Sequence, residues 1–73
     1  MQSENYRGYV LWGHAILEQP ATPERERYAA SGTVTKAGKF AEASGILDIA
    51  NSEMDAEHIG LEWARAWVDN HLV

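Results

Sequence analysis

The sequence predicts an α+β fold, in which a three-stranded antiparallel β-meander is followed by one C-terminal helix packed on one face of the sheet. Two observations carry this prediction. Ala30-Ser31-Gly32 and Ala43-Ser44-Gly45 flank the short segment Lys36-Ala37-Gly38-Lys39 as a mirrored pair, which is typical of two strands joined by a tight turn. The end of the chain repeats its apolar residues with helical spacing instead.

The chain is long enough for one small domain. It has 73 residues, of which 45 % are hydrophobic, and it has no cysteine, so disulfides and thiolate metal sites are excluded. We therefore expect a single domain over 1–73. A core of this size contributes only about 3–5 kcal/mol, and oligomerisation is a common way for such domains to gain stability. We expect a homodimer.

Residues 6–17 predict the first strand because they are rich in aromatic and β-branched residues. Both of its alternating sides are apolar, so we expect it to be covered on both faces, or to be central and bulged. Gly8 and Gly13 are candidate positions for a bulge or kink. The next segment, 18–26, holds both prolines of the chain and predicts a solvated loop.

Residues 27–36 and 39–50 predict the second and third strands. A two-residue turn centred on Ala37-Gly38 places Ser31 opposite Ser44, and a four-residue loop gives the same register. One face of this hairpin is then uncharged and small in its middle, and it is the candidate core face. The other face is mostly polar. A slip of one residue would turn polar side chains toward the core, which disfavours other registers.

The same register places Arg27 opposite Asp48, a favourable cross-strand pair. In this register the small residues share one face of the hairpin, where another element can approach the sheet closely. Close packing of large side chains on small ones is how protein cores reach their usual density. We therefore expect the helix to lie on this face.

Residues 53–72 predict the C-terminal helix. Ser52 is the natural N-cap, and the first turn is acidic, which suits the positive end of the helix dipole. Gly60 costs about 1 kcal/mol inside a helix, and a close approach to the small-residue face of the hairpin would explain it. We expect Trp63 and Trp67 to fill the space over the alanines and glycines of that face.

Composition disfavours several classes of partner. The 11 acidic and 6 basic residues give a net charge of -5, whereas nucleic acids and anionic membrane surfaces require a basic face. No apolar run approaches the roughly 20 residues of a membrane span, and the first residues lack the features of a signal peptide. We expect a cytoplasmic protein with no nucleic-acid and no membrane partner.

Few residues carry candidate chemistry. His58 and Glu62 are four residues apart on the helix, as in a two-ligand metal clip or an ordinary surface pair, and no third ligand is evident. His14 could serve Ser31 or Ser44 as a base only if the first strand lies beside the second, and a solvated hydroxyl face is the alternative. We expect no catalytic residue, no cofactor, no metal and no enzymatic activity.

The apolar residues exceed what one domain of this size can bury. Both sides of the first strand, a second stripe of the helix and the outer face of the hairpin all carry them. Surplus apolar surface is typical of association, so we expect a self-association interface on the first strand or the helix stripe. The candidate interface residues are Leu61, Val68, Leu72, Tyr9, Leu11, Phe40 and Ile46.

The segment 60–71, with Trp67-Val68-Asp69 near its end, resembles the C-terminus of small uncharacterised bacterial proteins that end in an Ala-rich helix with a Trp-Val/Ile-Asp signature. The resemblance implies a β-meander with a C-terminal helix and no activity. Three strands before a helix are also similar to the compact domain of HicB-type antitoxins, which bind a small toxin and self-associate. We expect a self-associating interaction or regulatory module. The alternatives are an antitoxin-like partner-binding protein and a small-ligand-binding domain.

Overall fold

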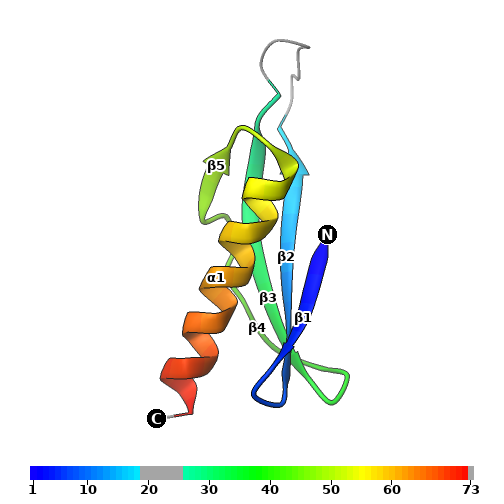
Figure 1. The fold of residues 1–73 in the computed structure, drawn as a ribbon, viewed down its shortest axis with the longest axis vertical. Coiled ribbons are helices and arrows are strands. Elements are labelled where there is room, and N and C mark those ends of the chain that lie inside the picture. Colours follow the sequence, from blue (N-terminus) through cyan, green and yellow to red (C-terminus); the bar gives the residue numbers. More distant parts are fainter. Residues whose placement is uncertain (19–25, 73) are drawn as a thin grey trace.

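The computed structural model describes residues 1–18 and 26–72, and it confirms the α+β fold (Figure 1). One helix, α1 (Glu53–His71), lies against one face of a single antiparallel sheet. The strands run in the order β1-β2-β3-β4, and β5 pairs with β3 beside β4. Their bounds are β1 (Gln2–Tyr6), β2 (Tyr9–Leu17), β3 (Tyr28–Lys36), β4 (Lys39–Ala43) and β5 (Asp48–Ala50).

The predicted first strand is in fact the end of one strand and the whole of the next. Arg7 and Gly8 have φ angles of 52° and 88°, so they form a two-residue turn that places Tyr6 opposite Tyr9. Gly8 therefore belongs to a hairpin turn and not to a bulge. The strand before it, β1, is an edge strand of the sheet. The sequence alone does not predict it, because its residues are mostly polar.

The predicted register of the β3–β4 hairpin is right only near its turn. Ala37 and Gly38 have φ angles of 52° and 76°, and Thr35 lies opposite Phe40 as expected. A bulge between Val34 and Thr35 then shifts the pairing by one residue. Ser44 consequently lies beside Gly32, so the expected Ser31–Ser44 pair is wrong.

Ser44 is held at Gly32 by two hydrogen bonds. Its backbone N–H donates to the carbonyl oxygen of Gly32 at 2.9 Å, and its hydroxyl oxygen accepts from the Gly32 N–H at 2.8 Å. Gly45 has a φ of 73°, and β4 ends before it, so the predicted strand 39–50 is broken. The chain rejoins β3 as β5 with Asp48 opposite Ala30, which excludes the expected Arg27–Asp48 pair.

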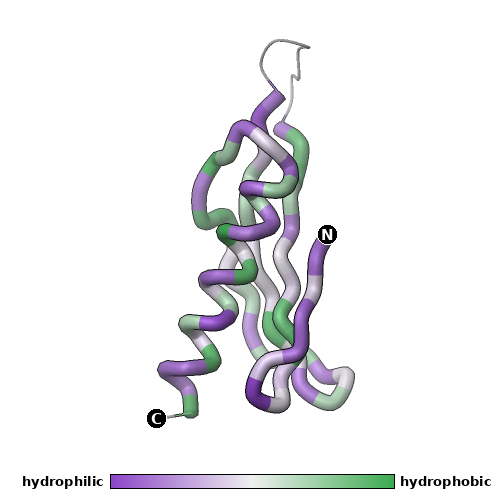
Figure 2. Tube along the Cα trace, viewed as in Figure 1, coloured by the Kyte–Doolittle hydropathy of each residue, from purple (hydrophilic) through white to green (hydrophobic). Residues whose placement is uncertain are grey.

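The helix agrees with its local signals. It begins at Glu53, and the Ser52 hydroxyl accepts a hydrogen bond from the Asp55 backbone N–H at 3.1 Å, which confirms the N-cap. Hydrophilic and hydrophobic stretches alternate along it (Figure 2). Its buried residues do not include Trp63 and Trp67, which were expected to cover the small-residue face; they are Ala56, Glu57, Gly60, Leu61, Ala64 and Val68. The two tryptophans flank these residues.

The helix touches the sheet through glycines. Gly13 and Gly32 lie opposite each other in β2 and β3. A Cβ atom on Gly13 would lie 2.0 Å from the carbonyl oxygen of Glu57, and one on Gly60 would lie 2.1 Å from that of Ser31. The close approach expected for Gly60 is therefore confirmed. With backbone against backbone, no space for a ligand remains between the layers at this point.

The two tryptophans occupy different places. A Cβ atom on Gly32 would lie 2.9 Å from a ring carbon of Trp63, which confirms that Trp63 lies over the small face. Trp67 packs instead against Tyr9, with ring centroids 6.1 Å apart, beside the larger core cluster. That cluster consists of Tyr9, Leu11, Val34, Leu61, Ala64 and Val68. A smaller cluster consists of Ala30, Ala50 and Ala56.

Candidate functional site

The face of the sheet away from α1 is covered by no other element of residues 1–18 and 26–72 (Figure 1). Alternation along the strands decides which side chains it carries. Leu11 and Gly13 point toward α1, so Trp12 and His14 point away from it. We call this surface the open face. Its residues are Ser3, Asn5, Val10, Trp12, His14, Ile16, Ala29, Ser31, Thr33, Thr35, Phe40, Ala43 and Ile49.

The open face carries apolar side chains along its whole length. Phe40 is 68 % exposed near the turn end, and Ile16 is 50 % exposed near the other end. Val10, Trp12 and Ile49 are half-buried between them. Apolar side chains that gather on one uncovered sheet face are typical of a surface for association.

Two hydrogen bonds join polar side chains of the open face. The Trp12 indole N–H donates to the Thr35 hydroxyl oxygen at 3.0 Å. His14 Nε2 lies 3.0 Å from the Thr33 hydroxyl oxygen, and both bonds cross from β2 to β3. Because these groups already have partners within the face, covering the face would leave neither of them without a hydrogen bond.

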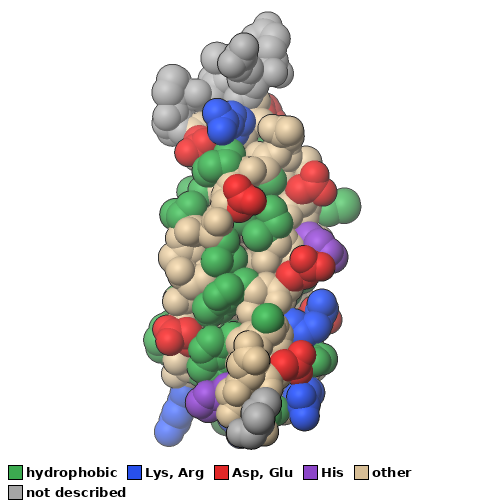
Figure 3. Space-filling model, turned by 90° about the vertical axis from the view of Figure 1, so that its left-hand side faces the viewer, with side chains coloured by type: hydrophobic (Ala, Val, Ile, Leu, Met, Phe, Trp, Pro, Cys, Tyr) green, Lys and Arg blue, Asp and Glu red, His purple; other side chains and the backbone are tan. Residues whose placement is uncertain are grey.

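The open face is uncharged in a chain with a net charge of -5. His14 is the one ionisable side chain among its residues. Glu18 and Arg27 close one end of it, where the Glu18 backbone N–H donates to the Arg27 carbonyl oxygen at 2.9 Å. The side that carries α1 and β5 is different, because charged side chains lie among its hydrophobic ones (Figure 3).

Four of the seven candidate interface residues are not on the surface. Tyr9, Leu11, Leu61 and Val68 are no more than 7 % exposed and form the core of the single chain. The helix stripe that looked surplus is the stripe that covers the sheet, and Tyr9 and Leu11 lie beneath it. These four side chains are thus unavailable to a partner in this structure.

The other three candidates are exposed, but they lie apart from one another. Phe40 is on the open face, Ile46 follows β4, and Leu72 ends the helix. Sequence reasoning missed Trp12 and Ile16 as surface residues of the same face as Phe40. Their alternation with Leu11 was a usable signal, but the alternation alone did not show which side α1 covers.

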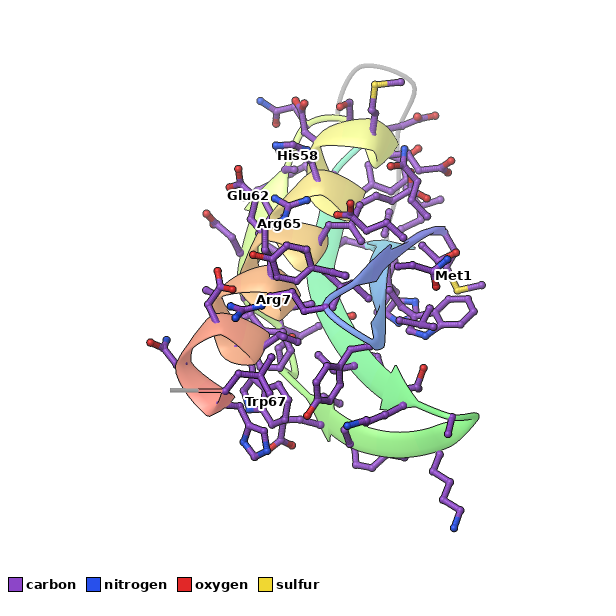
Figure 4. The ribbon with its side chains drawn as sticks, turned by 60° about the horizontal axis from the view of Figure 1, so that its bottom comes forward. Met1, Arg7, His58, Glu62, Arg65 and Trp67 are labelled. Carbon is purple, nitrogen blue, oxygen red and sulfur yellow. The ribbon has the colours of Figure 1, made fainter. Side chains whose placement is uncertain are left out.

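A group of polar side chains ties β1 to α1. The Tyr6 hydroxyl donates to Asp69 Oδ1 at 2.8 Å, and Arg7 Nη1 donates to the same oxygen at 2.9 Å. Arg65 pairs with Glu4 in the same region (Figure 4). Hydrogen bonds from Tyr6 and then Arg7 lower the pKa of Asp69, and the hydrogen bond to Asp69 raises the pKa of Tyr6. We interpret this group as structural.

The buried carboxylate of the helix is also paired. Glu57 is 5 % exposed, and it forms an ion pair with the N-terminal ammonium group of Met1. The hydrogen bond to Glu57 raises the pKa of this ammonium group. A buried charge requires such a partner, so the pair is explained by stability alone.

The residues singled out for metal binding or catalysis are not assembled into a site. His58 Nε2 lies 3.2 Å from Glu62 Oε1, and both side chains are exposed, as in an ordinary surface pair (Figure 4). No group of three or more metal-binding side chains occurs in the described part of the chain. His14 lies opposite Ser31, but its Nε2 is bonded to Thr33.

The comparisons leave the function to be argued from the site. No family model matches the chain, and neither a curated protein nor a solved structure matches it. The helix that the structure describes is too polar to cross a membrane. The likeness to small bacterial proteins and to HicB-type antitoxins therefore stays a prediction.

Proposed function

We propose that the protein is an interaction module that self-associates as a homodimer through the open face. One observation carries the proposal: in a chain with a net charge of -5, the strands of one sheet face place no charged side chain on it, and apolar side chains lie along its whole length. Covering this face leaves the hydrogen bonds of Trp12 and His14 intact. The association also gains from the burial of the apolar surface of Trp12, Ile16 and Phe40.

The distribution of charge makes the open face the surface on which a second copy of the same chain can dock. Two copies of an acidic protein repel each other wherever their carboxylates come close. The strands place no carboxylate on the open face, so two copies that meet there avoid this repulsion at the contact. Two sheets that stack face to face interleave their side chains in a layer about 10 Å thick. Stacking would give this small domain a second apolar core.

Sedimentation equilibrium over a range of protein concentrations tests the proposal. We expect a species of twice the 8.1 kDa mass of one chain. Ile16→Lys and Phe40→Lys place a charge on exposed positions of the open face and should weaken the dimer by about tenfold or more, the effect of about 1.4 kcal/mol. Met54→Lys is the matched control, because Met54 is 70 % exposed on α1, which covers the opposite face.

Two results would contradict the proposal. An 8.1 kDa species at every concentration would show that the chain does not self-associate. The antitoxin-like alternative, in which a different protein covers the face, would then be the one to test. A dimer that Met54→Lys weakens as much as Ile16→Lys would show that the open face is not the interface.

A further inference from the structure

His14 lies in the middle of the open face, between Trp12 and Ile16 along β2 and opposite Ser31 of β3. Its side chain is half-buried, and its Nε2 is bonded to the hydroxyl of Thr33 at 3.0 Å. A neutral imidazole bonded in this way can be covered by an apolar surface at modest cost, whereas a protonated one needs a counter-charge.

No carboxylate of the described residues is placed to supply that counter-charge. The nearest charged residues along the chain on this side are Glu18, which follows β2, and Arg27, which precedes β3; both are exposed and lie beyond Ile16 and Ala29. β4 and β5 contribute Ala43 and Ile49 to the open face.

The remaining charged groups near β2 point to the other side of the sheet. The Met1 ammonium group pairs with Glu57 of α1, and Glu4 of β1 pairs with Arg65 of α1. The sheet itself separates these pairs from His14. A proton gained by His14 would therefore remain uncompensated if the open face were covered.

We propose that His14 makes self-association through the open face pH-dependent, so that protonation of its imidazole separates the two copies. This inference rests on the proposed function. A dimer formed through the open face would bury two such rings, one from each copy, and protonation would place two like charges in an interface without acidic groups. Free imidazole side chains gain their proton between about pH 8 and 5, so the dimer should be tightest near pH 8 and weaken as the pH falls.

The dissociation constant of the dimer, measured by sedimentation from about pH 8 to about pH 5.5, tests the inference. For the wild-type chain we expect the constant to rise by about tenfold or more over this range. His14→Gln keeps a hydrogen-bonding group for Thr33 but cannot be protonated, so its dimer should not respond to pH. His58→Gln and His71→Gln, on exposed positions of α1, should respond as the wild type does.

A second measurement on the wild-type chain removes any dependence on how well His14→Gln folds. The imidazole resonances of His14, followed by NMR, should change over the same pH range in which sedimentation shows the dimer to dissociate. Circular dichroism of each variant establishes that it has the fold of the parent chain.

The outcomes separate this inference from the proposed function. A wild-type chain that is monomeric at every pH overturns the proposed function and this inference with it. A dimer whose dissociation constant is the same at both ends of the pH range overturns the role of His14 alone. A pH response that persists in His14→Gln has the same meaning.

Discussion

At the scale of single residues, three glycines set the distance between the layers. Gly13, Gly32 and Gly60 stand where the backbone of α1 meets the backbones of β2 and β3, and a Cβ atom at any of them would overlap a backbone oxygen. Gly38 and Gly45 serve another purpose, because they adopt positive φ angles with open space around them. The two kinds of glycine should respond differently to substitution.

Gly13→Ala should destabilise the fold by about 3 kcal/mol or more, because the backbone oxygen of Glu57, 2.0 Å from the new Cβ, can yield only if the helix shifts. Gly38→Ala should cost only about 1–2 kcal/mol, the strain of a left-handed backbone. Urea unfolding of the two variants measures both values. Equal losses would show that the helix is not held at this distance.

Ala37 is a residue that the turn tolerates but does not prefer. It has a φ of 52° at the first central position of a two-residue turn, where asparagine is favoured. Ala37→Asn should therefore stabilise the protein by about 0.5–1 kcal/mol, and Ala37→Val should destabilise it, because a β-branched residue resists this backbone. The midpoints of urea unfolding check the order, and a more stable valine variant would contradict the turn geometry.

At the scale of elements, β1 is held both by its backbone pairing with β2 and by side-chain bonds to α1. It is an edge strand of five residues, and the group of Tyr6, Arg7 and Asp69 joins its end to α1. The hydrogen bond between Tyr6 and Asp69 needs a protonated phenol and an ionised carboxylate. The contribution of this bond to stability is consequently limited at both ends of the pH scale.

Tyr6→Phe removes this hydrogen bond, and the stability that it loses should depend on pH. The pKa of Asp69 is lowered by folding, so its contribution is present above the unfolded pKa and is lost as the pH falls through the folded one. The pKa of Tyr6 is raised, so its contribution is present below the unfolded pKa and is lost as the pH rises through the folded one. The wild type should exceed Tyr6→Phe in stability at neutral pH, and the difference should shrink toward both extremes.

An NMR titration of Asp69 gives a direct check on the same bond. The pKa of its carboxyl group should be higher in Tyr6→Phe than in the wild type, because Tyr6 is the first cause of its lowering. Arg7→Gln is the matched comparison, and it should raise this pKa as well, because the hydrogen bond and the charge of Arg7 both lower it. An unchanged pKa in Tyr6→Phe would contradict the contact.

The elements that could be predicted are those with local signals. The helix follows from Ser52 and from the spacing of its apolar residues, and the turn at Ala37-Gly38 follows from its glycine. β1 could not be predicted, because its polar residues show no alternation, and pairing with β2 makes it a strand. The bulge at Val34 and the break at Gly45 depend on packing that sequence spacing does not encode.

The candidate site divides in the same way. The alternation of residues 10–16 shows that Val10, Trp12 and Ile16 share one side of a strand. It does not show which side the helix covers, because both sides are apolar. The contact of Gly13 with α1 decides that question, and it is a tertiary contact between residues far apart in the chain. Without knowledge of this contact, the sequence alone assigns Tyr9 and Leu11 to an interface.

At the scale of the whole molecule, the fold has two layers, a sheet and a helix, and the helix covers only one face of the sheet. The core between sheet and helix is small, and three glycines bring the backbones of the two layers into close contact in its middle. Glu4, Glu57 and Asp69, whose carboxylates form ion pairs or hydrogen bonds, lie on the helix side of the sheet or at its edge. Apolar surface is left for association on the other side.

This distribution predicts how salt affects the proposed dimer. Each copy carries a net charge of -5, and the open face contributes no ion pairs to the interface. The long-range force between the copies is thus repulsive, and salt screens it, with a Debye length that falls from about 30 Å at 0.01 M to about 8 Å at 0.15 M. Raising the salt concentration over this range should tighten the dimer by roughly tenfold.

Sedimentation equilibrium in a series of sodium chloride concentrations measures this effect. Glu62→Gln removes one negative charge from an exposed position of α1, so its dimer should be tighter at low salt and its dependence on salt shallower. An interface held by ion pairs would behave in the opposite way, since screening weakens attraction between opposite charges. A dimer that loosens as salt is added would therefore place charged residues in the interface, and the open face has none to offer at neutral pH.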